Sequence, residues 1–76
     1  MEQHRRLCDL PDNGTGTVEH IDTGGSIRTR LMELGLIENT RVQCIGTSPL
    51  GDPRAYMIRG AVIALRSEEA KNIYIK

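Results

Sequence analysis

The sequence predicts a mainly β fold, in which about five short strands form a small closed barrel with one α-helix and one short helical turn. Three observations predict it. Short stretches alternate apolar with polar residues, turn residues separate these stretches at close intervals, and a helical period occurs only once. The 76 residues are expected to form a single domain, 1–76, because a chain of this size buries only about 60% of its unfolded surface.

The first strand is expected over residues 17–21, after a turn-rich segment, PDNGTG, at 11–16. Val18 and Ile21 are its apolar residues, and strict alternation would place them on opposite faces of the strand. We therefore expect an irregularity in this strand. Residues 1–6 are expected to form a mobile N-terminus.

The inserted helix is expected over residues 26–35, because the spacing of its apolar residues is helical. Its apolar face is formed by Ile27, Leu31 and Leu34. The hydroxyl group of Ser26 is expected to cap the first turn. Gly35 suits the left-handed residue that ends a helix, and Asn39 is expected to accept a positive φ in the following turn.

Further strands are expected over residues 40–48, 54–59 and 61–66 and at the C-terminus. Their inward residues are expected to be Val42, Cys44, Tyr56, Ile58, Ile63, Leu65, Ile73 and Ile75. Gly60 is expected to mark a kink or bulge between two of these strands. Ser67 is expected to cap a helical turn over residues 67–72, whose carboxylates suit the positive end of the helix dipole.

Composition argues against two classes of function. Ten Lys and Arg balance ten Asp and Glu, and the chain has two Tyr but no Phe or Trp. A nucleic-acid partner is therefore not expected, because such binding requires a basic surface and often aromatic stacking platforms. The sequence contains no phosphate-binding loop and no nucleophile motif, so we expect neither GTP binding nor an enzymatic activity.

Cysteine usage and hydropathy predict the cellular location. Cys8 and Cys44 are expected to be reduced, since the chain has neither a signal peptide nor an apolar run long enough to span a membrane. The protein is thus expected to be cytoplasmic and to reach a membrane only through a partner.

The sequence does not predict a metal site. His4 and Cys8 would share a face only if they were helical, while His20 and Cys44 lie on expected strands. No ligand cluster of the kind that ferrous iron requires is present. Cys44 is expected to be a small buried apolar residue. No cofactor is expected, although weak binding of a divalent metal is compatible with the sequence.

The segment SPLGDP at residues 48–53 predicts a rigid hairpin loop, because two prolines fix φ and a glycine supplies a turn conformation. A pre-organised loop binds a partner at low entropic cost, but it also suits a purely structural role. Met32 on the helix and Leu50 on the loop are expected at the surface, where each suits a partner contact. The residues expected at a partner interface are Met32, Leu50, Gly51, Asp52, Pro53 and Arg54.

The arginines allow two interpretations. Those on the helix and on the later strands would either form a patch for an acidic partner or make ordinary ion pairs on a solvated face. They are Arg28, Arg30, Arg54, Arg59 and Arg66, and the carboxylates available to them are Glu33, Glu38 and Asp52.

Several segments in series carry a resemblance to a known family. They are LMELGL (31–36), PLGDP (49–53), IRG (58–60), ALR (64–66) and EEAKNI (68–73). In this order and spacing the chain resembles the ferrous iron transport protein A family, FeoA, over residues 17–76, and more loosely through LCDLPDNG at 7–14. The sequence differs at Glu38-Asn39, where the family often has Pro-Gly in the turn.

The resemblance implies an SH3-like barrel and an accessory role in bacterial ferrous iron uptake. The implied partner is the transporter FeoB, through its cytosolic GTP-binding region. A related barrel forms the C-terminal domain of diphtheria-toxin-repressor-type regulators, so a metal-sensing barrel stays an alternative. The exposed strand edges of such a barrel permit a monomer or a weak homodimer.

Overall fold

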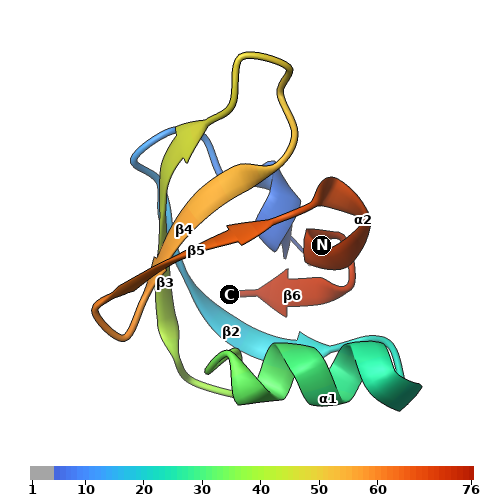
Figure 1. Ribbon diagram of the computed structural model, residues 1–76. Coiled ribbons are helices and arrows are strands. Elements are labelled where there is room, and N and C mark those ends of the chain that lie inside the picture. The colour runs from blue at the N-terminus through green and yellow to red at the C-terminus, as the bar shows by residue number, and fades with distance from the viewer. Residues whose placement is uncertain (1–4) are drawn as a thin grey trace.

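The computed structural model describes residues 5–76, and in it six strands form one antiparallel sheet that curls into a small barrel (Figure 1). Their order in the sheet is β1–β6–β2–β3–β4–β5. The strands are β1 (Arg5–Arg6), β2 (Thr15–Ile21), β3 (Arg41–Thr47), β4 (Arg54–Ile58), β5 (Ala61–Leu65) and β6 (Ile73–Ile75). The mainly β class predicted from the sequence is confirmed.

Three helical segments complete the fold. The inserted helix α1 (Gly25–Glu33) connects β2 to β3, and the short helix α2 (Ser67–Ala70) connects β5 to β6. A 3₁₀ helix, η1 (Leu7–Asp9), follows β1. In Figure 1, α1 lies along one end of the barrel and the loop between β3 and β4 projects from the opposite end.

Strand β2 pairs with two neighbouring strands, β3 and β6. Residues 15–17 pair with β3, whereas the later part of the strand pairs with β6, and the register shifts between Val18 and His20. This shift lets both Val18 and Ile21 point into the core, so the predicted irregularity is confirmed. The strand begins at Thr15, two residues earlier than expected, within the segment assigned to a turn.

The core is aliphatic and fills the inside of the barrel around Tyr56. Its buried residues are Leu7, Leu10, Val18, Ile21, Leu31, Leu36, Val42, Cys44, Tyr56, Ile58, Leu65, Ala70, Ile73 and Ile75. The expected inward residues are all among them except Ile63, which is half-buried. Close approach of β2 to β6 requires Gly16, because a Cβ atom there would lie 2.7 Å from Cδ1 of Ile75.

The N-terminal segment packs against β6 and the core. Arg5 and Arg6 pair with β6, and the Arg6 guanidinium lies 5.5 Å from the centre of the Tyr74 ring. Leu7 and Leu10 then enter the core. The sequence indicated a mobile terminus over residues 1–6. The last two of those residues lie in β1, and the others lie outside the described residues.

The turn conformations were predicted better than the helix caps. Asn39 has φ 72° and Gly35 has φ 101°, as expected. Gly60, however, marks neither a kink nor a bulge. It forms a two-residue hairpin turn with Arg59, in which both residues have positive φ, and β5 pairs with β4 directly after it.

The two predicted serine caps are wrong. Helix α1 begins at Gly25, and its N-cap is Gly24 rather than Ser26. Helix α2 begins at Ser67, so Ser67 is its first helical residue, and carboxylates bind its first amides instead. The expected apolar face of α1 is only partly correct, because Leu31 is buried but Ile27 is 46% exposed.

Candidate interaction surfaces

The loop between β3 and β4, residues 48–53, is a tight turn with an exposed tip. The Gly51 amide donates to the Ser48 carbonyl at 2.8 Å, and the Ser48 amide donates to the Pro53 carbonyl at 3.3 Å. Gly51 has φ 85°, a conformation that favours glycine. The side chain of Leu50 is 93% exposed at the tip. The loop therefore presents one large apolar side chain to solvent.

One side of the loop is held by Arg54, whose side chain is only 14% exposed. Its Nη1 donates to the Cys8 carbonyl at 3.0 Å and its Nε donates to Oγ1 of Thr47 at 3.2 Å. Its Nη2 lies 3.4 Å from Oδ1 of Asp12, which also accepts a 2.8 Å hydrogen bond from Thr47. These contacts join the base of the loop to the N-terminal segment.

The other side of the loop is held by Asp52. Its Oδ1 accepts a 2.9 Å hydrogen bond from the amide of Ser67, the first residue of α2. This donor lies 15 residues away from Asp52 along the chain. Asp52 and Arg54, both expected at a partner interface, thus make internal contacts that position the loop, and Leu50 is the residue they present.

Helix α1 carries the second expected surface. Met32 is 42% exposed and lines a groove of about 380 Å³ between α1 and β2. Ile37 and His20 also line this groove. Met32 and Leu50 are both at the surface, as predicted, but α1 and the 48–53 loop lie at opposite ends of the molecule (Figure 1). The structure therefore does not bring these two residues into one surface.

Three of the five arginines make contacts within the molecule. Arg28 donates from Nη1 to the Ile21 carbonyl at 3.0 Å, and Arg30 forms an ion pair with Glu69 that links α1 to α2. Arg54 is engaged at the loop, as described above. None of these contacts involves Glu33, Glu38 or Asp52, the carboxylates that the sequence analysis named as possible partners. The partners of these three arginines belong to other elements of the fold.

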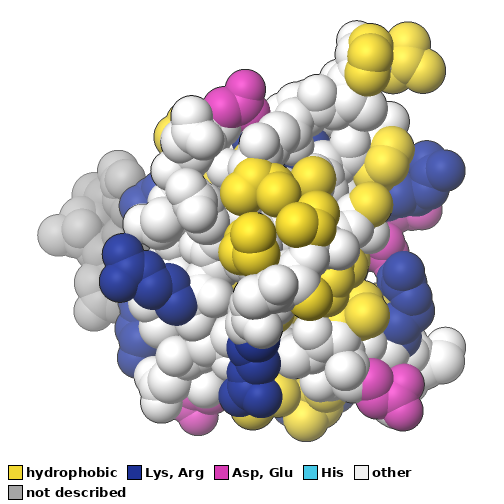
Figure 2. All heavy atoms as spheres, turned by 60° about the vertical axis from the view of Figure 1, so that its left-hand side comes forward, with side chains coloured by type: hydrophobic (Ala, Val, Ile, Leu, Met, Phe, Trp, Pro, Cys, Tyr) yellow, Lys and Arg dark blue, Asp and Glu magenta, His cyan; other side chains and the backbone are white. Residues whose placement is uncertain are grey.

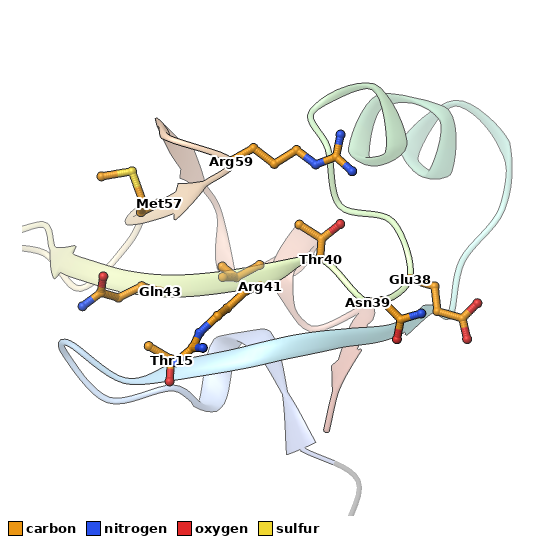
Figure 3. Close-up of a pocket in the computed structure, with 9 residues that line it drawn as sticks. Thr15, Glu38, Asn39, Thr40, Arg41, Gln43, Met57 and Arg59 are labelled. Atoms are coloured by element: carbon orange, nitrogen blue, oxygen red, sulfur yellow. The ribbon is translucent and has the colours of Figure 1, made fainter.

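A second hollow, of about 680 Å³, lies on the outer face of β2, β3 and β4 (Figure 3). Arg41 extends along it toward Thr15, and Arg59 extends from the β4–β5 turn toward α1. Met57 and Gln43 stand on neighbouring strands at its other side. Sequence analysis did not identify this groove. Its only sequence signal is the set of outward positions that alternate with the core residues of β3 and β4.

Two titratable side chains among the described residues, Cys8 and Tyr56, have clearly raised pKa values. Partial burial, and then the neighbouring Asp9 carboxylate, raise the pKa of the Cys8 thiol, so this thiol stays protonated at neutral pH. Burial raises the pKa of Tyr56 to about 12. Cys44 is fully buried, as predicted.

Potential metal ligands are dispersed. Within residues 5–76, no group of three or more His, Cys, Asp or Glu side chains lies close enough together to hold a metal ion. His20 instead stacks on Tyr74, with ring centroids 4.8 Å apart. His4, which the sequence analysis considered together with Cys8, lies outside the described residues.

Over the same residues, no helix has the length and apolar character needed to cross a membrane.

Comparisons with known proteins agree on the family. The model of the FeoA domain matches residues 5–76. The Fe(2+) transport protein A/Fe(2+) transporter FeoB fusion protein of Porphyromonas gingivalis is 27% identical over 71 residues. That alignment covers 93% of this chain but only 8% of the fusion protein.

Solved structures agree on the fold. The FeoA-like protein of Clostridium acetobutylicum is 29% identical, with a TM-score of 0.90 and coverage of 100% of this chain and 88% of that one. The FeoA of Stenotrophomonas maltophilia, a zinc complex described as an SH3 domain protein, is 28% identical with a TM-score of 0.85, over 95% and 89% of the two chains. A manganese-dependent transcriptional repressor, 23% identical with a TM-score of 0.86, covers 100% of this chain and shares the fold over 37% of its own length. Since the family model matches residues 5–76 of a 76-residue chain, the protein belongs to the FeoA domain family and has its SH3-like fold.

Proposed function

We propose that this protein is a small accessory protein of ferrous iron uptake, which acts in the cytoplasm by contact with a FeoB-type transporter rather than by catalysis. The observation that carries the proposal is the P. gingivalis fusion protein, whose name joins transport protein A to the transporter in one polypeptide. Two activities joined in one chain are held at high effective concentration, which suits partners that must meet. We expect the partner region to be the GTP-binding part of the transporter.

The 48–53 loop is the surface we propose for this contact. An exposed leucine at the tip of a loop that is held on both sides suits an anchor that fills a partner pocket. Because the tip is already ordered, docking costs little conformational entropy. Asp52 and Arg54 act in this proposal by positioning the loop, and Leu50 makes the contact.

An NMR titration tests this proposal. The isotopically labelled chain would be titrated with the GTP-binding region of the transporter from the same organism, and we expect localised shifts over residues 48–54. Leu50→Asp should weaken the affinity at least tenfold, about 1.4 kcal/mol, while Ile27→Asp, at an exposed apolar site on α1, should leave it unchanged. Equal affinities for the wild type and Leu50→Asp would remove the loop from the interface, and no shifts at all would contradict the contact itself.

The groove beside α1 is a second candidate surface for the same partner. It is favoured by the exposed side chains of Met32 and Ile37, since methionine adapts its shape to different partners. Met32→Asp would weaken docking if this groove is the interface. Ile27→Asp is the matched control, because it lies on the same helix with similar exposure but about 140° away around the axis.

A metal-sensing barrel is the alternative function, and the repressor neighbour supports it only as a fold. The dispersed ligands of residues 5–76 argue against a strong metal site. We expect anaerobic calorimetry with Fe²⁺ to show no stoichiometric site of micromolar affinity, with weak binding as the most it would detect. A stoichiometric micromolar site would favour the metal-sensing alternative over the accessory role.

A further inference from the structure

Strand β5 lies at one edge of the sheet. It pairs with β4 along one side, and no other strand within residues 5–76 pairs with it along the other side. An unprotected edge strand is a template for pairing with another chain, because its outward N–H and C=O groups lack partners.

The hairpin register identifies which backbone groups of β5 are free. The two-residue turn makes Ile58 and Ala61 a hydrogen-bonded pair, so Ile63 and Leu65 also bond to β4. The amides and carbonyls of Val62 and Ala64 therefore point away from β4. No backbone partner for these groups occurs in the described part of the chain.

This edge also lacks the devices that usually prevent pairing. The strand reads AVIAL, with no charged residue, no proline and no register shift in its pairing. Val62 is 60% exposed and stands opposite Met57, while Ala64 stands opposite Ala55. Hydrophobic side chains gather near the middle of one face of the molecule (Figure 2). The outward residues of β5 and β4 thus continue an apolar surface up to the free edge.

We propose that β5 pairs antiparallel with β5 of a second copy of this chain, about a two-fold axis at Ile63. In this register Val62 of each copy faces Ala64 of the other, and each such pair exchanges two N–H···O=C bonds. Ile63 faces its own counterpart as a close, non-hydrogen-bonded pair. The two sheets then form one continuous sheet across the axis.

The pattern of the strand favours a second copy over another occupant. The free backbone groups at Val62 and Ala64 lie symmetrically about Ile63, so the strand is complementary to itself. No charged side chain within residues 61–65 is placed opposite a like charge across the axis. The chain has no formal net charge that would repel a copy.

The buried area predicts a weak dimer. Five residues on each side bury much less than the roughly 1,200 Å² of a stable interface. We therefore expect a dissociation constant of about 0.1–1 mM. This inference does not depend on the proposed transporter contact, since the 48–53 loop and α1 contribute nothing to it.

The protein alone provides the test. Sedimentation velocity and NMR spectra would be recorded from about 0.02 to 2 mM, and we expect the mean mass to rise toward the dimer, with amide shifts centred on residues 62–64. Ala64→Pro removes an N–H group that β4 does not use, so the spectrum of the folded monomer should persist while self-association is lost.

Two further variants keep the test decisive if Ala64→Pro does not fold. Val62→Lys adds a charge at the edge and should abolish dimerisation, whereas the isosteric Val62→Thr should keep it. A constant monomer mass over the whole range would overturn the proposal. So would self-association that Val62→Lys leaves unchanged, or shifts at Val62 and Ala64 that appear only when the transporter region is added.

Discussion

At the scale of single residues, the guanidinium of Arg54 joins three parts of the chain: the base of the 48–53 loop, Asp12 and the carbonyl of Cys8. We expect Arg54→Ala to lower the free energy of unfolding by about 2–3 kcal/mol, because a partly buried carbonyl and a carboxylate lose their donor. Urea denaturation measures this change. Arg41→Ala, an exposed arginine on β3, is the control and should change stability by less than about 0.5 kcal/mol.

The same variant separates a structural role of Arg54 from a binding role. If Arg54 positions the loop, Arg54→Lys should recover part of the lost stability through its charge but not the forked contacts. A variant Arg54→Ala that is as stable as the wild type and yet fails to bind the transporter region would show instead that Arg54 contacts the partner directly.

Tyr56 gives the protein a predicted sensitivity to alkaline pH. Burial raises its pKa from 10.0 to about 12, although the nearby Arg54 lowers it. Between these values the unfolded state has lost the phenolic proton while the folded state retains it, so raising the pH favours unfolding. The stabilising term is complete below pH 10 and is lost as the pH approaches 12.

Comparison with Tyr56→Phe isolates this effect, because the variant has no phenolic proton but shares every other titrating group. Between roughly pH 8 and pH 11, the wild type should lose on the order of 1–2 kcal/mol of unfolding free energy more than the variant. Parallel losses in the two proteins, measured by urea denaturation at each pH, would contradict the raised pKa.

At the scale of elements, the β4–β5 hairpin depends on its two-residue turn. Gly60 has φ 83°, and a side chain there would be strained even though a Cβ atom would meet nothing within 4 Å. Gly60→Ala should therefore lower stability by about 1–2 kcal/mol. Gly46→Ala is the matched control, since Gly46 has an ordinary φ and equally open surroundings, and it should be neutral or stabilising by up to about 1 kcal/mol. Thermal denaturation should show a lower melting temperature for Gly60→Ala than for the wild type, and an equal or higher one for Gly46→Ala.

The sequence predicted those elements whose signals are local. The alternation in β4 and β6 and the left-handed residues Asn39 and Gly35 depend on neighbours a few positions away, and the structure agrees with each. Strand β1 was missed because a two-residue strand exists only through its partner β6. Ile27 was assigned to the core because helical spacing gives a face but not how far along the helix the barrel reaches.

In the candidate site, too, the sequence predicted the features that depend on neighbouring residues and missed those that depend on distant ones. The exposure of Leu50 followed from the turn chemistry around it, which places the residue at a loop tip. Apart from Thr47, which lies seven residues from Arg54, the donors and acceptors that hold the loop lie 15 to 46 residues away from Asp52 and Arg54. No local pattern contains such partners, so their positioning role appeared only in the folded chain.

At the scale of the whole molecule, the two candidate surfaces cannot share one ordinary interface. The Cα atoms extend over 32 × 29 × 22 Å, with α1 and the 48–53 loop at opposite ends (Figure 1). A standard interface covers about 800 Å² on each partner, against an accessible surface of 4747 Å². One partner domain should therefore cover one end only.

We accordingly expect only one of the two variants, Leu50→Asp or Met32→Asp, to weaken binding of the transporter region. The double variant should then bind with the same affinity as the single variant that binds more weakly. The affinities measured by NMR titration, with Ile27→Asp as the shared control, decide which end docks. If both single variants weaken binding and their effects add, the partner must contact both ends. The chain would then have to sit inside a cleft of the transporter, because no flat surface reaches both the loop tip and α1.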